Sequence, residues 1–197
     1  LGMGLARAHR VSYVGELGWE IYVSTEMASH AFEALHAAGQ PLGLKLCGMH
    51  TMDSCRIEKA FRHFGHDITS EDNVVDAGLS FAVDLSKPDF IGKSAVAARK
   101  ESGPKARMVQ FLLQDSQPLL YHNEPILRDG EIVGYLSSGG YGHTLGAAVG
   151  LGYVPSEGQS AAEVLASSYE IDVKGTRVKA TASLKPMYDP KSEKVRV

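Results

Sequence analysis

The chain has few of the residues that mark disulfide scaffolds or membrane spans. It contains two cysteines and one tryptophan in 197 residues. No apolar run approaches the ~18 residues that a membrane helix needs. Cys47 and Cys55 do not make a disulfide framework, and on one predicted helix they would lie about 12 Å apart along its axis, too far for a bridge. We therefore expect a reducing compartment, either the cytoplasm or, in a eukaryote, the mitochondrial matrix.

Positive charge is also scarce. The 20 lysines and arginines are outnumbered by 23 acidic residues, which leaves a net charge of −3, and no basic block stands out. These features argue against a nucleic-acid or membrane partner. The N-terminus lacks the basic and apolar regions of a signal peptide. The chain starts at Leu1 and enters strand-like sequence almost at once, so we expect a piece of a longer protein.

Residues 1–103 have the pattern of an α+β unit. Apolar alternation and the glycine-rich turn at 15–18 predict a hairpin. The expected elements are strands over 5–14 and 17–24, helices over 26–38, 48–61 and 91–102, and a strand over 79–85. Helices packed over an antiparallel sheet make a two-layer arrangement.

Residues 104–197 have a different pattern, with short strands and turn dipeptides. The expected strands are 106–113, 124–128, 131–137, 147–154, 167–173 and 176–184, with a helical turn at 160–165. Evenly spaced short strands without a long helix predict a small antiparallel β-barrel or sandwich. The boundary between the two domains is expected near Gly103.

Glu16 lies in the predicted hairpin turn between Gly15 and Gly18. A carboxylate fixed in such a turn can hold an amidine-like edge, such as an aminopyrimidinone, by two parallel hydrogen bonds. The alternative is an ordinary solvated glutamate, which the residues alone favour.

Arg56 lies beside the buried face of the second predicted helix. A guanidinium and a carboxylate that converge on one pocket can recognise a planar polar heterocycle with an acidic tail. The alternative is that Arg56 pairs with Asp53 and extends its head group to solvent.

The His63-x-x-His66 pair next to Asp67 has a spacing that can bind metal. A third ligand is not evident and Gly65 interrupts the helix, so we expect no metal site. The glycine-rich run 139–142 links two strands and opens no helix, so it is not a dinucleotide fingerprint. We therefore expect no flavin site in this chain.

Several motifs resemble the aminomethyltransferase (glycine cleavage T-protein) family along the whole chain. They are YVGELGWE at 13–20, DSCRIE at 53–58, DFIGK at 89–93, SSGGY at 137–141 with TLG at 144–146, and LKPMYDP at 184–190. The RHFGHD run at 62–67 is more similar to the version of the family fused to dimethylglycine and sarcosine dehydrogenases.

The resemblance implies an α+β fold in which a ferredoxin-like layer over 1–103 binds folate and a β-barrel occupies 104–197. It implies that Glu16 contacts the pterin and that Arg56 belongs to the folate site. Tyr141 would line the folate entrance, and Tyr188 matches a region that contributes to the pocket. The family's catalytic aspartate would lie upstream of Leu1, so no catalytic residue is expected in this chain.

The implied cofactor is tetrahydrofolate, with FAD only in an upstream domain. In this scheme the flavin domain oxidises an N-methylated amine, and tetrahydrofolate receives the oxidised carbon. A stand-alone aminomethyltransferase with a lipoyl carrier protein is the first alternative. A non-catalytic folate-binding scaffold is the second, although the KGCYxGQE motif of such relatives is not present. The chain alone is expected to be inactive.

Overall fold

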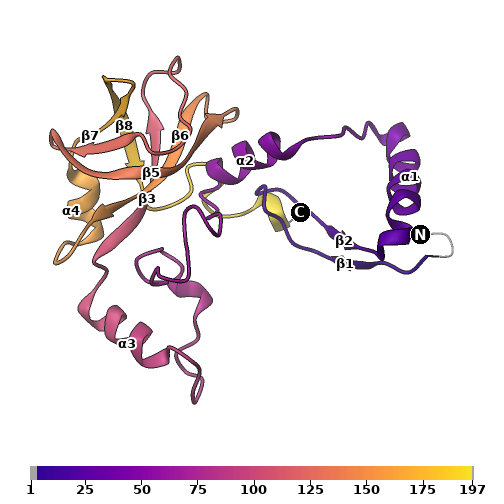
Figure 1. Ribbon diagram of the computed structural model, residues 1–197, viewed down its shortest axis with the longest axis horizontal. Helices are drawn as coiled ribbons and strands as arrows, with labels where there is room; N and C mark the ends of the chain where they lie inside the picture. The colour runs from indigo at the N-terminus through magenta and orange to yellow at the C-terminus, as the bar shows by residue number, and fades with distance from the viewer. Residues whose placement is uncertain (1–3, 197) are drawn as a thin grey trace.

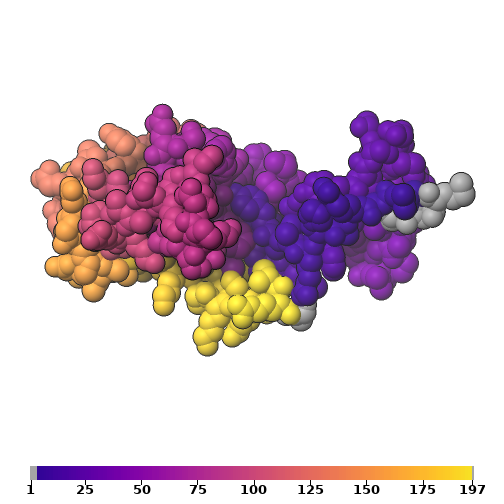
Figure 2. Space-filling model, turned by 90° about the horizontal axis from the view of Figure 1, so that it is seen from below, coloured from indigo at the N-terminus to yellow at the C-terminus, as the bar shows by residue number. Residues whose placement is uncertain are grey.

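The computed structural model describes residues 4–196, which form an elongated molecule (Figures 1 and 2). A β-barrel occupies one end, and a short hairpin with helix α1 (Ala28–Gly39) occupies the other. Helix α2 (Met49–Glu58) lies between them. The C-terminal segment, yellow in both figures, returns from the barrel to the hairpin.

The barrel is closed, with the strand order β3-β6-β5-β4-β7-β8 and antiparallel pairing throughout. Its strands are β3 (Ala106–Leu113), β4 (Pro125–Arg128), β5 (Glu131–Gly142), β6 (Ala147–Pro155), β7 (Tyr169–Val173) and β8 (Thr176–Ser183). Helix α4 (Ala161–Ala166) begins with a capping box between Ser160 and Glu163. Closure leaves the sheet without a free edge.

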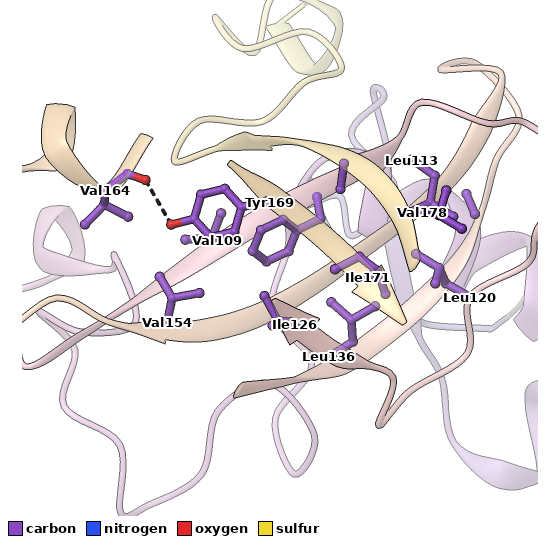
Figure 3. Packing of buried hydrophobic residues seen from close by; sticks show 13 residues of the cluster. Val109, Leu113, Leu120, Ile126, Leu136, Val154, Val164, Tyr169, Ile171 and Val178 are labelled. Carbon is purple, nitrogen blue, oxygen red and sulfur yellow. Dashed lines mark hydrogen bonds between the residues drawn. The ribbon is translucent and has the colours of Figure 1, made fainter. Parts of the chain in front are cut away.

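Alternation along the strands supplies the barrel core. On β3, Val109, Phe111 and Leu113 are at most 2% exposed, and they pack with apolar residues of the other strands (Figure 3). Tyr169 is also buried, and its hydroxyl donates to the Val164 carbonyl over 2.9 Å. The buried phenol therefore keeps a hydrogen-bond partner, as a polar group in a core requires.

The hairpin end is much less packed. Strands β1 (Arg7–His9) and β2 (Glu20–Tyr22) pair over three residues each, followed by the 3₁₀ turn η1 (Thr25–Met27) and α1. Ala31 is the buried residue of α1. The strands are shorter than the expected 5–14 and 17–24, because the chain from 10 to 19 forms an irregular loop.

The segment between α2 and the barrel departs from the expected strand over 79–85. Ser80–Ala82 forms the 3₁₀ helix η3, and Phe81 is 86% exposed. A short apolar run does not distinguish strand from turn by itself, and within residues 4–196 this run has no partner strand. Helix α3 (Lys93–Ser102) follows, and two further 3₁₀ helices are η2 (Gln40–Leu42) and η4 (Lys194–Arg196).

The α+β class and the small antiparallel barrel are confirmed. The barrel, rather than a sandwich, is the form that the strands adopt. The expected end of a strand at 137 was wrong, because the glycine-rich run 139–142 is part of β5 and pairs with β6 instead of linking two strands. Both cysteines are free, as expected, but the expected helical position of Cys47 was wrong, since α2 begins at Met49. Among residues 4–196, no helix is both long and apolar enough to cross a membrane.

Candidate functional site at the end of helix α2

The C-terminal end of α2 concentrates buried charge. Arg56, Glu58 and Lys59 are each at most 3% exposed, although they lie within four consecutive positions. The positive φ of Ala60 (53°) then turns the chain away from the helix. Charges are rarely buried unless they are paired, so the partners of these three residues define the site.

Arg56 is tied to three segments. Its Nε donates to Asp53 Oδ1 (2.9 Å), and its Nη1 donates to Asp67 Oδ2 (2.6 Å) and to the Phe61 carbonyl (3.3 Å). Its Nη2 donates to Ser138 Oγ over 2.9 Å. The expected contact with Asp53 is present, but the side chain is 4% exposed, so Arg56 does not extend to solvent.

Asp67 is the fully buried partner of this arginine. It also accepts from the His63 backbone N–H (2.8 Å) and from the Ser137 hydroxyl. The register of β5 shifts between Leu136 and Ser138, which marks an irregularity at Ser137. Successive side chains of a regular strand point to opposite faces, whereas a bulge re-aims them. Ser137 and Ser138 thus both reach the Arg56–Asp67 pair.

Glu58 and Gln110 join α2 to the barrel and to the C-terminal segment. Glu58 Oε1 accepts from the backbone N–H groups of Thr144 (2.7 Å) and Leu145 (2.8 Å) in the β5–β6 turn. Gln110 donates to the carbonyls of Ile57 and Glu58, and its oxygen accepts from Met187 N–H over 2.8 Å. These bonds satisfy backbone groups at the end of the helix that have no partner within it.

Glu16 and Tyr188 meet near this helix end. The Tyr188 hydroxyl donates to Glu16 Oε1, and this hydrogen bond raises the pKa of Tyr188 to about 12. Both side chains are accessible to solvent, and 172 positions separate them in the sequence. The Tyr188 backbone N–H donates to the Glu58 carbonyl over 3.3 Å, which anchors the segment.

Lys59 contacts the segments that carry both residues of this pair. Its side chain is fully buried, and its Nζ binds Asp189 Oδ2 over 2.9 Å and the Asp189 carbonyl. The ammonium also lies 5.9 Å from the centre of the Tyr188 ring. Gly15 (φ 79°) packs on the stem, since a Cβ there would lie 3.0 Å from Lys59 Cδ. One lysine thus contacts the turn that carries Glu16 and the segment that carries Tyr188.

Arg56 and Tyr141 line a different space, a cavity of about 490 Å³ between α2, β5 and the 119–122 segment. Tyr141 accepts from Ser54 Oγ (2.5 Å) through its carbonyl and donates to the Gly146 carbonyl (2.9 Å) through its hydroxyl. Glu16 and Tyr188 are not among the lining residues. The structure therefore places the four predicted folate residues in two pairs, one that lines this cavity and one that does not.

A smaller cavity of about 270 Å³ lies beside the hairpin loop, where Ser12, Gly18 and Phe61 are among its lining residues. The rings of His63 and His66 contact each other at a tilt of 42°, with their centres 4.5 Å apart. In the part of the chain that the structure describes, no group of three or more histidine, cysteine or acidic residues is placed to hold a metal ion.

Sequence reasoning missed the roles of Glu58, Lys59, Asp67, Gln110 and Ser138. One signal was available, because three charges within positions 56–59 of a helix cannot all face solvent when the helix packs on a barrel. Ser138 lies 82 positions from its partner Arg56, and Asp189 lies 130 positions from its partner Lys59. Neither contact gives a local signal in the sequence.

Comparisons with known proteins give consistent matches. The family model described as the GCVT N-terminal domain matches residues 1–87, and that of the glycine cleavage T-protein C-terminal barrel domain matches residues 107–189. The chain is 44% identical over 194 residues to the 4-methylaminobutanoate oxidase (formaldehyde-forming) of Paenarthrobacter nicotinovorans, covering 98% of this chain and 23% of that protein.

Two more relatives represent the two kinds of enzyme in the set. Human mitochondrial sarcosine dehydrogenase is 33% identical over 196 residues, which cover 98% of this chain and 21% of that protein. The aminomethyltransferase of Symbiobacterium thermophilum is 36% identical over 180 residues, which cover 91% of this chain and 47% of that protein. The chain thus spans about a fifth of the oxidase and dehydrogenase and about half of the aminomethyltransferase.

A solved structure agrees with these matches. The crystal structure of glycine cleavage system aminomethyltransferase T from Bartonella henselae superposes with a TM-score of 0.81 at 26% sequence identity. The match covers 93% of this chain and 50% of that one.

Proposed function

Because the chain belongs to the glycine cleavage T-protein family, we propose that it is the tetrahydrofolate-binding part of a one-carbon-transfer enzyme. In this proposal, a flavin domain elsewhere in the full-length protein oxidises an N-methylated amine such as dimethylglycine or sarcosine. Tetrahydrofolate then receives the oxidised methyl carbon. The identities with an oxidase and a dehydrogenase that are several times longer than this chain support the fusion.

The observation that carries the proposal is the pair of Glu16 and Tyr188. Glu16 Oε1 takes one hydrogen bond from Tyr188, which fixes the carboxylate while leaving it accessible to solvent. A carboxylate has about four acceptor sites, so most of its capacity is left for a ligand. The free acceptor sites of Glu16 fit the amino and ring N–H donors of a pterin, which can form two parallel hydrogen bonds with a carboxylate.

Tetrahydrofolate would supply the amine nucleophile, and the residues of this chain would hold the tetrahydrofolate in position. Glu16 and Tyr188 would orient the pterin plane, and Lys59 would hold both of them through Gly15 and Asp189. Fixing a nucleophile near an electrophilic carbon removes much of the entropic part of a barrier.

Arg56 and Tyr141 would contribute from the cavity of about 490 Å³ that they line. Four of the five guanidinium N–H groups of Arg56 already have protein acceptors. One N–H on Nη2 is left for a ligand in the cavity, so we propose that Arg56 acts mainly by ordering the cavity wall. Residues 1–103 would form the folate-binding domain and 104–197 the barrel domain that closes against it.

The test is titration of folinic acid into the full-length protein. Glu16→Gln and Tyr188→Phe should each weaken binding roughly tenfold, since a hydrogen bond to a charged group is worth about 1.5–3 kcal/mol. Glu33→Gln is the control, because Glu33 is exposed on helix α1 and lies outside the motifs that carry the resemblance. Arg56→Ala is titrated in the same way. Unchanged affinity for folinic acid in both Glu16→Gln and Arg56→Ala would refute the assignment of these residues to the folate site.

A stand-alone aminomethyltransferase that acts with a lipoyl carrier protein is the second candidate. The superposition with an aminomethyltransferase favours it. Flavin absorbance in the purified full-length protein would decide for the dehydrogenase fusion. The chain alone is expected to fold without catalysing transfer, and an accelerated formation of methylene-tetrahydrofolate from formaldehyde by residues 1–197 would contradict this. A non-catalytic folate-binding scaffold ranks third.

The compartment is part of the same proposal. The relatives include a human mitochondrial dehydrogenase and bacterial enzymes. We propose the cytoplasm for a bacterial protein and the mitochondrial matrix for a eukaryotic one.

A further inference from the structure

Residues 186–196, which we call the C-terminal strap, follow β8 and return from the barrel to the hairpin loop (Figures 1 and 2). The strap carries Tyr188, whose hydroxyl donates to Glu16. It ends in η4, where Val195 lines the cavity of about 270 Å³ beside the hairpin loop. The strap thus contacts the turn that holds the carboxylate proposed to bind the pterin.

Apolar packing contributes little to the position of the strap. None of residues 186–196 is buried, and none of them belongs to a hydrophobic core cluster. Val195 and Phe61 line the same small cavity, so the apolar end of the strap packs incompletely on the hairpin loop. Burial of apolar surface is the main stabilising contribution to folding, so a segment that lacks it opens more easily than the rest of the chain.

Polar contacts with three other segments hold the strap instead. The backbone N–H of Met187 donates to Gln110 Oε1 (2.8 Å), and that of Tyr188 donates to the Glu58 carbonyl (3.3 Å). The third contact is the hydrogen bond from the Tyr188 hydroxyl to Glu16. The net gain from one such hydrogen bond does not exceed the entropic cost of ordering one backbone residue. These hydrogen bonds alone therefore do not offset the ordering of the whole strap.

Asp189 supplies the charged contact that keeps the strap in place. Its carboxylate pairs with the buried Lys59 (2.9 Å) and accepts from the backbone N–H groups of Glu193 (2.9 Å) and Lys194 (3.2 Å). Its φ of 41° lies in the left-handed region, which is unfavourable for most residues other than glycine. One carboxylate thus joins the middle and the end of the strap to the end of α2.

We propose that the C-terminal strap is a gate of the Glu16 site, which opens locally while the barrel stays folded and closes over a bound pterin. The identity of this ligand rests on the proposed folate function. Opening breaks the hydrogen bond between Tyr188 and Glu16 and gives a ligand access to the carboxylate. A ligand that contacts both side chains has those contacts only in the closed form, so it shifts the strap towards closure.

Amide hydrogen exchange of the full-length protein, followed by mass spectrometry of its peptides, measures the opening. Without ligand, residues 186–196 should exchange roughly a hundredfold or more faster than residues 106–113 of β3, because local opening needs less free energy than unfolding of the barrel. Saturating folinic acid should slow exchange in the strap roughly tenfold or more, since it stabilises only the closed form. Strap exchange as slow as that of β3, or strap exchange that bound folinic acid leaves unchanged, would overturn the proposal.

Asp189→Asn and Glu193→Gln are a matched pair, because each removes one carboxylate charge from the strap. Asparagine tolerates the left-handed backbone, so Asp189→Asn weakens the contact with Lys59 and keeps the turn. In stopped-flow measurements this variant should release folinic acid roughly tenfold faster, from the loss of a charged hydrogen bond, and should also bind it faster. Glu193 is exposed, so Glu193→Gln should keep both wild-type rates.

The two rates distinguish a gate from a fixed wall. A residue that only forms a wall changes release alone, whereas a gate limits entry as well. Faster release with unchanged entry in Asp189→Asn would therefore overturn the proposal. Unchanged exchange of residues 106–113 in this variant shows that its barrel is folded.

The folate function fails or survives separately. A full-length protein that does not bind folinic acid would reject that function. Faster exchange of the strap in Asp189→Asn than in Glu193→Gln, measured without ligand, would then still support local opening of the gate, and equal exchange would overturn it. Tight binding of folinic acid with no response of the strap would keep the folate function and reject the gate.

Discussion

The two ends of this molecule bury their apolar side chains to different extents. The barrel closes on itself, and Phe111 and Ile171 are completely buried. At the hairpin end, Trp19 is 58% exposed and Phe32 is 53% exposed, although both are large and apolar. Figure 1 shows the same contrast, with a closed sheet at one end and an open hairpin and helix at the other.

The buried charged side chains at the end of helix α2 lie between these two ends. Helix α2 is attached to the barrel by buried polar groups, among them Arg56, Glu58 and Gln110. Buried polar groups hold one geometry, because any other geometry leaves them without partners. The comparison indicates that the barrel supplies stability and that the polar segment beside it supplies the precise placement of side chains.

The largest effect is expected in the barrel core. Phe111→Ala should lower the free energy of unfolding by about 3–5 kcal/mol, because it leaves a cavity among packed side chains. The same substitution at Phe32 in α1 should change it by less than about 1 kcal/mol, since that ring is half exposed. Urea denaturation of both variants measures the contrast, and equal losses would mean that the hairpin end has a core of its own.

A second large effect is expected where α2 meets the barrel. Asp67→Ala should cost about 3 kcal/mol or more of unfolding free energy, because it removes a fully buried carboxylate from Arg56. Asp76 pairs with Arg99 near the surface, so Asp76→Ala is the control and should cost about 1 kcal/mol. If thermal and chemical unfolding show similar losses for the two variants, the polar attachment of α2 is not important for stability.

Lys59 should affect the site more than the fold. Lys59→Met keeps the stem that packs on Gly15 but removes the ion pair with Asp189, so the C-terminal segment should loosen. We expect roughly tenfold weaker folinic acid binding and faster proteolysis within residues 186–196, from the loss of about 1.5–2 kcal/mol. Lys191→Met, at an exposed position of the same segment, is the control. Wild-type affinity in Lys59→Met would show that the lysine does not position Glu16.

The smallest effect concerns ionisation of Tyr188. Its pKa is raised to about 12 by the hydrogen bond to Glu16, so the protonated hydroxyl is favoured in the folded state. The associated stability is complete below about pH 10, the ordinary tyrosine value, and is lost as the pH rises towards 12.

Ultraviolet absorbance titration tests this assignment. Glu16→Gln should move one tyrosine ionisation down towards pH 10, and Tyr188→Phe should remove it. A titration curve that Glu16→Gln leaves unchanged would contradict the hydrogen bond.

The sequence determined most of the barrel. Strand β3 begins and ends where apolar alternation predicts, at Ala106 and Leu113, and the turns at Asp129-Gly130 and Lys174-Gly175 separate the expected strands. Alternation and turn residues are local signals, and the barrel uses them consistently. The motifs that carry the family resemblance are also local, and the matches over residues 1–87 and 107–189 confirm the family.

Only the tertiary structure decided what the charged residues do. The sequence marks Glu16 and Arg56 as candidates, but it does not show that Glu16 meets Tyr188 or that Arg56 is buried against Asp67. These partners depend on how the barrel, the C-terminal segment and α2 fold back on one another. A buried charge must find a partner wherever the chain brings one, so its role follows from distant contacts rather than from its neighbours in the sequence.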